Sequence, residues 1–368
     1  MPVNPLVGLG RLGQSPWYDY ITRDLLTTGE LDRLIREDDL LGMTSNPTIF
    51  EKAVSGSDLY DDDIVQGVRA GKAPAEIFEA LAVADVRGAC DHFRETFDRL
   101  NNGDGTVSIE VSPGAAFDTE ATVAEARRLW TSVGRPNAFI KIPGTEPGLA
   151  AITRCLAEGI NVNITLLFSL QRYEQVIGAW LAGLEQRLDA GQPIDHLHSV
   201  ASFFVSRVDT KIDPLLDKRG DPEHIRGTIA IANAALAYDL FQQTLASPRW
   251  KALAAQGAHV QRPLWASTST KDPQFPDIYY VEALVAPQTV NTMPPETFAA
   301  YKDHGRPEVR IQQAMAEAPG RLAALARAGI DLAAVTDELE AEGVKKFAAS
   351  YDSLLKGIEA KAGELAAR

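Results

Sequence analysis

The chain has 368 residues, of which 45% are hydrophobic and 23% are charged, proportions typical of a soluble globular protein. Its formal net charge of -14, from 36 basic and 50 acidic residues, argues against binding to nucleic acid or to an anionic membrane, so an anionic ligand would need local cations. Two cysteines are too few for a disulfide scaffold, and no apolar run approaches about eighteen residues, which together predict a cytoplasmic protein without a membrane span.

The first residues contain the pattern Gly8-x-Gly10-x-x-Gly13, which is typical of a dinucleotide-binding loop. Such a loop follows a buried strand and opens a helix, whereas here Pro2 and Pro5 precede the pattern and a strand follows it. The context therefore argues against dinucleotide binding.

Two predicted strands follow, and each carries polar residues near its end. The first, over residues 17–20, contains Asp19. The second lies in LLGMTSNPTIF, where Thr44 and Asn46 share one face before a proline ends the strand. An asparagine before a proline is equally common in an ordinary turn, so Asn46 alone supports either interpretation.

A helical insertion is predicted over about residues 51–100, followed by the strand TVSIEVSPG. This strand places Ser108 and Glu110 on one face and two apolar residues on the other. A carboxylate in a buried strand costs free energy unless it is paired or used in chemistry. Glu110 is therefore a candidate functional residue.

Residues 137–169, NAFIKIPGTEPGLAAITRCLAEGINVNITLLFS, predict a strand, a helix and a second strand, the pattern of a βαβ unit. Strand alternation points Lys141 away from its isoleucine neighbours and puts Asn163 and Thr165 on one face of the next strand. In a desolvated pocket, a lysine amine can lose its proton and attack a carbonyl group. The alternative is that Lys141 extends from the strand end into solvent.

Two later predicted strands also end in polar residues. In SVASFFVS, Ser202 and Phe204 share a face, and Arg207 begins the predicted loop that follows. In RPLWASTSTKDP, Ser267 ends the strand and Lys271 lies just beyond it. A cation after a strand is usually a surface residue, but these two are also placed to bind an anion.

The remaining sequence is mainly helical. A helical hairpin is predicted over residues 220–256, a last strand near Val290, and a helical C-terminal region over about 297–368. The helix around Phe347 and Tyr351 is a candidate to cover the active site. No repeat or linker requires a second domain, so residues 1–368 are predicted to form one domain.

Eight strands are predicted, and each of the first seven is followed by at least one helix. This alternation predicts an α/β fold, an eight-stranded parallel (β/α)8 barrel of the TIM type with extra helices and a helical C-terminal tail. The active site of such a barrel lies at the carboxyl ends of its strands, where the polar residues fall. They include one amine and two carboxylates but no convergent set of histidines or cysteines, so no metal ion is expected.

The segments GMTSNPTIFEKAV, FIKIPGT, GINVNITLLFS, SVASFFVSRVD and WASTSTK resemble the signatures of the transaldolases, in the same order and over nearly the whole chain. The resemblance implies a barrel enzyme with a Schiff-base lysine that transfers a dihydroxyacetone unit between phosphosugars in the pentose phosphate pathway. The expected donors are sedoheptulose 7-phosphate and fructose 6-phosphate, and the acceptors are glyceraldehyde 3-phosphate and erythrose 4-phosphate. A monomer or homodimer is expected.

The resemblance also implies a role for each candidate residue. Lys141 would form the Schiff base, Glu110 and Thr165 would move protons with a bound water, and Asp19 would take the proton from the C4 hydroxyl. The residues expected to bind the dihydroxyacetone unit or the phosphate are Thr44, Asn46, Asn163, Ser202, Phe204, Arg207, Ser267 and Lys271.

One position departs from the family pattern. Many transaldolases carry an arginine two residues after the serine that matches Ser267, whereas this chain has Ser269, so Lys271 is the candidate replacement cation. Two alternative functions remain open at this point. One is a fructose 6-phosphate aldolase on the same scaffold, and the other is a barrel that binds phosphosugars without turnover.

Overall fold

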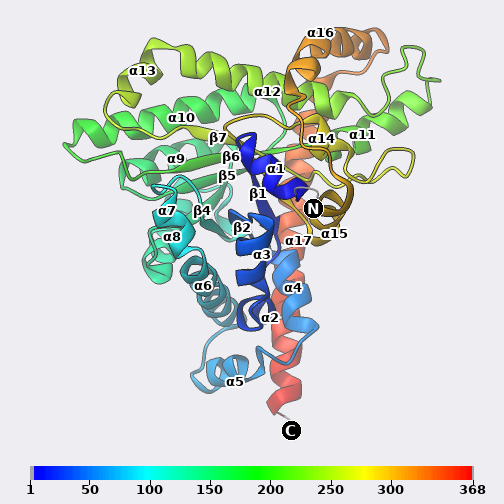
Figure 1. Ribbon diagram of the computed structural model, residues 1–368. Coiled ribbons are helices and arrows are strands. Elements are labelled where there is room, and N and C mark those ends of the chain that lie inside the picture. Colours follow the sequence, from blue (N-terminus) through cyan, green and yellow to red (C-terminus); the bar gives the residue numbers. More distant parts are fainter. Residues whose placement is uncertain (1–3, 367–368) are drawn as a thin grey trace.

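The computed structural model describes residues 4–366, and its centre is a closed barrel of eight parallel strands (Figure 1). The strands are hydrogen-bonded in chain order, and the last pairs with the first. The predicted (β/α)8 barrel is therefore confirmed. The strands are β1 Gln14–Asp19, β2 Gly42–Thr44, β3 Thr106–Glu110, β4 Ala138–Pro143, β5 Val162–Leu167, β6 Ser199–Phe204, β7 Gln261–Ala266 and β8 Thr289–Met293.

Helices surround the barrel. Those before β4 are α1 Pro5–Arg11, α2 Arg23–Thr27, α3 Glu30–Asp38, α4 Pro47–Ser55, α5 Asp61–Arg69, α6 Pro74–His92, α7 Arg94–Arg99, the short 3-10 helix η1 Pro113–Ala115 and α8 Thr119–Val133. Those after β4 are α9 Glu146–Ala157, α10 Leu170–Asp189, α11 Ser206–Asp217, α12 Ile229–Ala246, α13 Pro248–Ala254, α14 Tyr279–Ala283, α15 Pro295–His304, α16 Ile311–Arg327 and α17 Leu332–Ala366.

Strand alternation separates two apolar cores. Ile140 and Ile142 of β4 belong to the large core between the strands and the surrounding helices. Phe139 of the same strand belongs to a small cluster inside the barrel, where it packs near Trp17. The predicted alternation of β4 is confirmed, and it turns Lys141 toward the barrel interior.

The segment before β1 is helical, which the sequence did not predict. Asn4 caps α1 by accepting a hydrogen bond from the backbone of Leu6, and Pro5 occupies the first turn, where it is tolerated. Gly8 lies inside this helix against Pro307, where a Cβ atom would clash. Gly8 and Gly10 therefore lie in a helix that precedes the first strand, whereas a dinucleotide-binding loop follows a strand. Pro2 lies outside the described residues.

Two other predicted boundaries are wrong. Arg207 does not begin a loop but lies in the first turn of α11, which starts at once because the backbone N–H groups of Val205 and Ser206 bind carbonyls at the end of β7. The predicted helical hairpin begins at Ile229 rather than near residue 220. The intervening loop is held by Asp213, which accepts a hydrogen bond from the backbone of Gly227.

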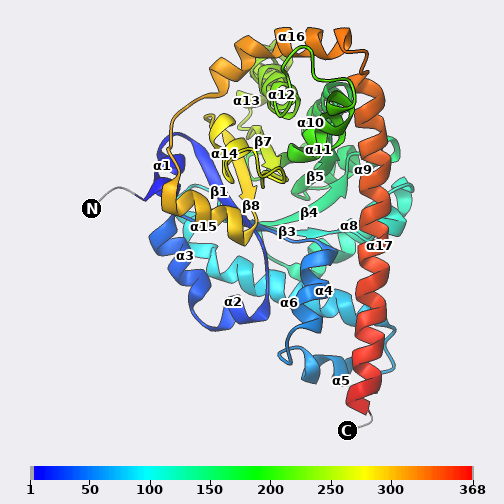
Figure 2. The same ribbon diagram turned by 90° about the vertical axis from the view of Figure 1, so that its right-hand side faces the viewer.

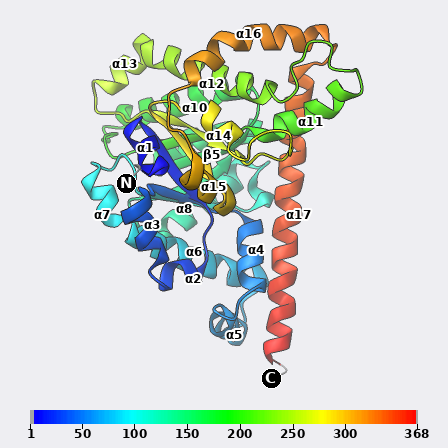
Figure 3. The ribbon, with the colours of Figure 1, turned by 45° about the vertical axis from the view of Figure 1, so that its right-hand side comes forward.

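The last helix, α17, is 35 residues long and runs the length of the molecule (Figures 2 and 3). It packs against α4, α5, α6 and α11 and touches β5, so it joins helices from both halves of the chain. It forms most of the expected helical C-terminal region.

Among residues 4–366, no helix is both long enough and apolar enough to cross a membrane.

Candidate active site

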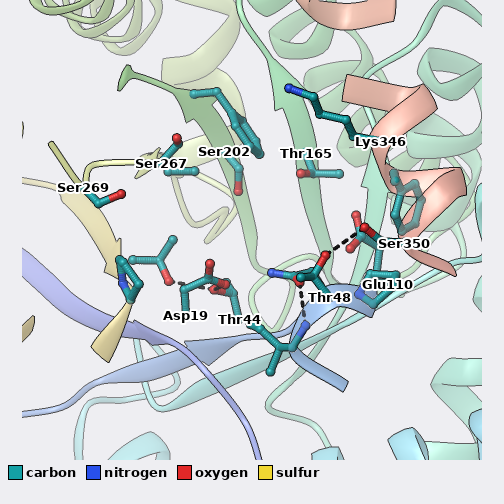
Figure 4. Close-up of a pocket in the computed structure, with 18 of the residues that line it drawn as sticks. Asp19, Thr44, Thr48, Glu110, Thr165, Ser202, Ser267, Ser269, Lys346 and Ser350 are labelled. Atoms are coloured by element: carbon teal, nitrogen blue, oxygen red, sulfur yellow. Dashed lines mark hydrogen bonds between the residues drawn. The ribbon is translucent and has the colours of Figure 1, made fainter. Parts of the chain in front are cut away.

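A cavity of about 460 Å³ lies at the carboxyl ends of the barrel strands (Figure 4). Eleven of the twelve site residues expected from the sequence line it. The exception is Asn163, which is fully buried beneath the cavity and uses its side-chain amide within the barrel: it donates to Ser108 and accepts from Ser202. Asn163 therefore supports the cavity floor in this structure.

Lys141 is 7% exposed and is the fourth of the six residues of β4. Its Nζ atom lies 3.3 Å from the backbone oxygen of Ser45 and 3.5 Å from Oε2 of Glu110. The strand register explains this arrangement, because Lys141 pairs with Glu110 of β3 on one side and with Asn163 of β5 on the other. Both contacts are long, so the amine is close to partners but not tightly held by them.

Two carboxyl groups, those of Glu110 and Asp19, line the cavity with the amine, and the protein covers most of each. Burial raises the pKa of Glu110 to about 7, although the neighbouring Lys141 opposes the shift. Burial also raises the pKa of Asp19, against the opposing charge of Lys141 and a hydrogen bond from Thr44. A carboxyl group that titrates near neutral pH can both donate and accept a proton there, which is the property required of a general acid and base.

Asp19 is positioned by a short hydroxyl chain. The Thr44 hydroxyl donates to Oδ1 of Asp19 at 2.7 Å, and the Thr292 hydroxyl lies 2.7 Å from that of Thr44. Because a hydroxyl group has only one hydrogen, Thr292 donates to Thr44 in this chain. The three residues come from β1, β2 and β8, so closure of the barrel creates the contact.

Backbone irregularities shape the rim of the cavity. Between Ile164 and Leu167, the pairing of β5 with β6 shifts register, and Leu166 adopts a left-handed φ of 62°. Ser267, directly after β7, has a φ of 55°, and its hydroxyl lies 3.0 Å from that of Ser206. Such conformations are costly for residues other than glycine and are concentrated at functional sites.

The cations expected to bind phosphate also line the cavity. The Arg207 guanidinium lies 4.8 Å from the centre of the Phe204 ring, and burial lowers its pKa. Lys271 is exposed at the rim, near the buried Ser269. Within the described chain, neither cation has a carboxylate within 4 Å, so both are available to an anion.

Sequence reasoning missed several residues that line the cavity. Thr292 lies near the carboxyl end of β8 and follows the rule used for the other strands, so the sequence contained the signal that would have found it. Glu296 follows the same strand in α15. Lys52 of α4 and Lys346 of α17 lie on helices, where no strand pattern points to them.

The helix around Phe347 and Tyr351, which was predicted to cover the active site, covers it only in part. Phe347 lines the main cavity, whereas Tyr351 lines a smaller neighbouring cavity of about 30 Å³.

The described residues contain no group of three or more histidine, cysteine, aspartate or glutamate side chains arranged to hold a metal ion.

Fold and site together define a (β/α)8 barrel whose mouth holds a buried amine beside two carboxyl groups, the arrangement used in lysine-based covalent chemistry on carbonyl compounds. Residues 16–358 match the family model described as Transaldolase/Fructose-6-phosphate aldolase. The chain belongs to this family.

Full-length relatives agree with the family match. The chain is 53% identical to a protein of Acidothermus cellulolyticus named Transaldolase, over 96% of both chains. It is 50% identical to a Transaldolase of Frankia alni and 47% identical to a Transaldolase 2 of a Nostoc species, each over 98% of both chains.

Proposed function

We propose that the protein is a transaldolase, a transferase that moves a dihydroxyacetone unit from a ketose phosphate to an aldose phosphate in the pentose phosphate pathway. The donor is fructose 6-phosphate or sedoheptulose 7-phosphate, and the acceptor is erythrose 4-phosphate or glyceraldehyde 3-phosphate. The observation that carries the proposal is the buried Lys141 amine, 3.5 Å from Glu110 in a cavity that also contains Asp19. The names and coverage of the relatives support it.

The first stage joins donor and protein. The neutral Lys141 amine adds to the C2 carbonyl of the ketose, and the resulting carbinolamine loses water to give an iminium ion. Glu110 supplies the proton that the departing hydroxyl group requires, with Thr165 holding the water. The raised pKa of Glu110 suits this role, because part of the population carries a proton at neutral pH.

The second stage breaks the sugar chain. Asp19 takes the proton of the C4 hydroxyl, the C3–C4 bond breaks, and its electron pair moves into the iminium ion to form an enamine. An aldose phosphate leaves, and the three-carbon unit stays on Lys141. The hydroxyl chain from Thr292 through Thr44 orients the Asp19 carboxylate for this step.

The third stage reverses the second with a new aldose. The enamine carbon attacks the acceptor aldehyde, Asp19 returns its proton to the new hydroxyl group, and water then releases the product ketose from Lys141. Asn46 and Ser202 hold the hydroxyl groups of the retained unit, with Asn163 supporting Ser202 from below. Arg207, Ser267 and Lys271 bind the phosphate group.

We further propose that residues 1–368 act as one domain without a metal or organic cofactor, in the cytoplasm and as a monomer or homodimer. The reaction needs neither, because the iminium ion itself accepts the electrons of the breaking bond. The phosphosugar substrates are small anions, and the positively charged side chains at the rim suit them.

The competing function within the family is an aldolase that releases free dihydroxyacetone. The two differ in their need for an acceptor: a transaldolase turns over fructose 6-phosphate only when erythrose 4-phosphate is present. The wild-type protein is therefore expected to form sedoheptulose 7-phosphate in the presence of both sugars and little dihydroxyacetone without the acceptor. Release of dihydroxyacetone at the same rate without acceptor would identify an aldolase.

The covalent step can be tested directly by reduction with borohydride in the presence of fructose 6-phosphate. Mass spectrometry of the digested protein is expected to find a three-carbon adduct on the peptide that contains Lys141. Lys141→Met is expected to lose both the adduct and at least about ten-thousand-fold in kcat, because an essential nucleophile has no substitute. An adduct on another lysine, or a fully active Lys141→Met, would contradict the assignment.

A further inference from the structure

We infer that Lys346, on the C-terminal helix α17, binds the phosphate group of the sugar substrate. The inference rests on the proposed function, and it assigns to α17 a part in substrate recognition as well as in covering the barrel. Figure 4 shows the Lys346 side chain extending from α17 over the mouth of the barrel, above Thr165 and Ser202.

One face of α17 is directed at the cavity. Gly343, Lys346, Phe347 and Ser350 all line it, and their spacing of three and four residues places them on the same side of a helix. Gly343 permits the close approach, because a Cβ atom there would lie 3.1 Å from Cδ2 of Leu166. The absence of a side chain at residue 343 thus brings the next turn, with its lysine, over the ends of the strands.

The charge of Lys346 is not used within the described part of the protein. The carboxylate one turn earlier on the same face, Glu342, would be the usual partner for a lysine four residues later. Glu342 instead pairs with Lys211 of α11, and Lys346 has no carboxylate within 4 Å among the described residues. A lysine that is left unpaired on a surface rich in acidic residues is available to an anionic ligand.

The cavity as a whole has the charge of an anion site. Among the described residues that line it, five side chains are cationic and three are carboxylates, in a protein whose net charge is -14. The cationic side chains are Lys52, Lys141, Arg207, Lys271 and Lys346. Arg207 reaches the cavity from α11 and Lys271 from the loop after β7, and Lys346 adds a cation from α17.

Contacts on both sides of the mouth hold α17 in place, which keeps Lys346 at the rim of the cavity. The hydroxyl groups of Ser350 and Thr48 are hydrogen-bonded at 2.9 Å, and Arg172 pairs with Glu340 at 3.3 Å. These contacts lie on the turns before and after Lys346. Because the helix is already ordered, binding through Lys346 costs only the conformational entropy of its side chain.

The test compares a phosphorylated acceptor with its unphosphorylated analogue, glyceraldehyde 3-phosphate with glyceraldehyde. Lys346→Ala is expected to raise the KM for glyceraldehyde 3-phosphate about three- to fivefold, the loss in binding expected when one exposed ion pair is removed. The KM for glyceraldehyde is expected to remain unchanged. Lys346→Arg is expected to restore the lower KM, and high salt to shrink the difference between wild type and Lys346→Ala. Lys345→Ala is the matched control, since Lys345 is exposed on the same helix but does not line the cavity.

Two outcomes would overturn the role of Lys346. One is a KM for glyceraldehyde 3-phosphate that is the same in Lys346→Ala and in Lys345→Ala. The other is an equal loss with both acceptors, which would indicate a disturbed α17 rather than a lost phosphate contact. Either result leaves the proposed function intact when the wild type still forms the three-carbon adduct on Lys141, whereas a wild type without the adduct would overturn the proposed function itself.

Discussion

The two ends of the barrel both bury charged side chains, but they satisfy them differently. At the amino end, Asp104 accepts hydrogen bonds from Trp17 at 2.8 Å, from Arg262 at 3.0 Å and from Ser15. At the carboxyl end, the Lys141 amine is 3.5 Å from its nearest carboxylate. The Asp104 carboxylate therefore has short partners on both oxygens, whereas the Lys141 amine has only long contacts.

This difference separates groups that stabilise the fold from groups kept for a ligand. A buried charge with every hydrogen-bonding position filled contributes to folding but cannot act on a substrate. A buried charge with long or missing partners costs folding free energy, and proteins retain it where it has a chemical use. The same substitution should therefore have opposite consequences at the two ends.

The largest effect expected from this comparison of the two ends is on catalysis at the carboxyl end. Asp19→Asn removes the proposed base but keeps the size of the side chain and an oxygen that can accept from Thr44. We expect kcat to fall about a hundred- to ten-thousand-fold, the usual contribution of a general acid or base, with no loss of stability. Steady-state kinetics and denaturant unfolding measure the two quantities.

Glu296→Gln is the control for this substitution, since Glu296 lines the same cavity but is exposed. It is expected to change kcat by less than about threefold, because an exposed side chain at the rim is far less constrained than a buried base. An Asp19→Asn protein that keeps more than a tenth of the wild-type kcat would remove Asp19 from the proposed mechanism.

The same change at the amino end should alter stability and spare catalysis. Asp104→Asn leaves the Arg262 guanidinium, which is only 16% exposed, without its carboxylate. We expect a loss of about 3 to 5 kcal/mol in the free energy of unfolding, as for other broken buried ion pairs, with kcat and KM of the folded protein unchanged. Asp98→Asn, in an exposed pair with Arg94, is the control and should cost less than about 1 kcal/mol. A stable but inactive Asp104→Asn would break the distinction between the two ends.

The sequence predicted the barrel and most of the mouth because both follow from strand alternation. A polar residue near the end of an apolar strand must lie at the mouth of a parallel barrel, and Lys141, Glu110 and Asp19 all obey this rule. The rule does not say how far below the mouth of the barrel a side chain lies. It placed Asn163 with the cavity residues, whereas the side chain points into the network below it.

Helical contributions to the site could not be predicted in the same way. Lys346 lies more than two hundred residues beyond Lys141, and its helix shows only which face is apolar, not what that face covers. The helix α11 was missed because its start depends on hydrogen bonds to β7, a contact between segments far apart in sequence. Tertiary contacts decided both cases.

The smallest effect expected from this comparison of the two ends is a gain of stability at the active site. Glu110 has a pKa raised by burial from 4.5 to about 7, so the folded protein binds this proton more tightly than the unfolded chain does. The contribution to stability is therefore complete below pH 4.5 and is lost as the pH rises through about 7. Ionisation of Glu110 should lower the free energy of unfolding by about 3 kcal/mol at pH 8, since one pKa unit corresponds to about 1.4 kcal/mol.

Glu110→Gln should recover this free energy, because the amide resembles the protonated acid at every pH. Denaturant unfolding is expected to find the variant more stable than the wild type at pH 8 and equal to it at pH 4, and the measurement at pH 4 is the internal control. The same variant should form the borohydride adduct more slowly, since it cannot donate the proton that dehydration requires. Equal stability of the two proteins at both pH values would mean that Glu110 ionises without penalty, and the contrast between Glu110 and the fully paired Asp104 would then be lost.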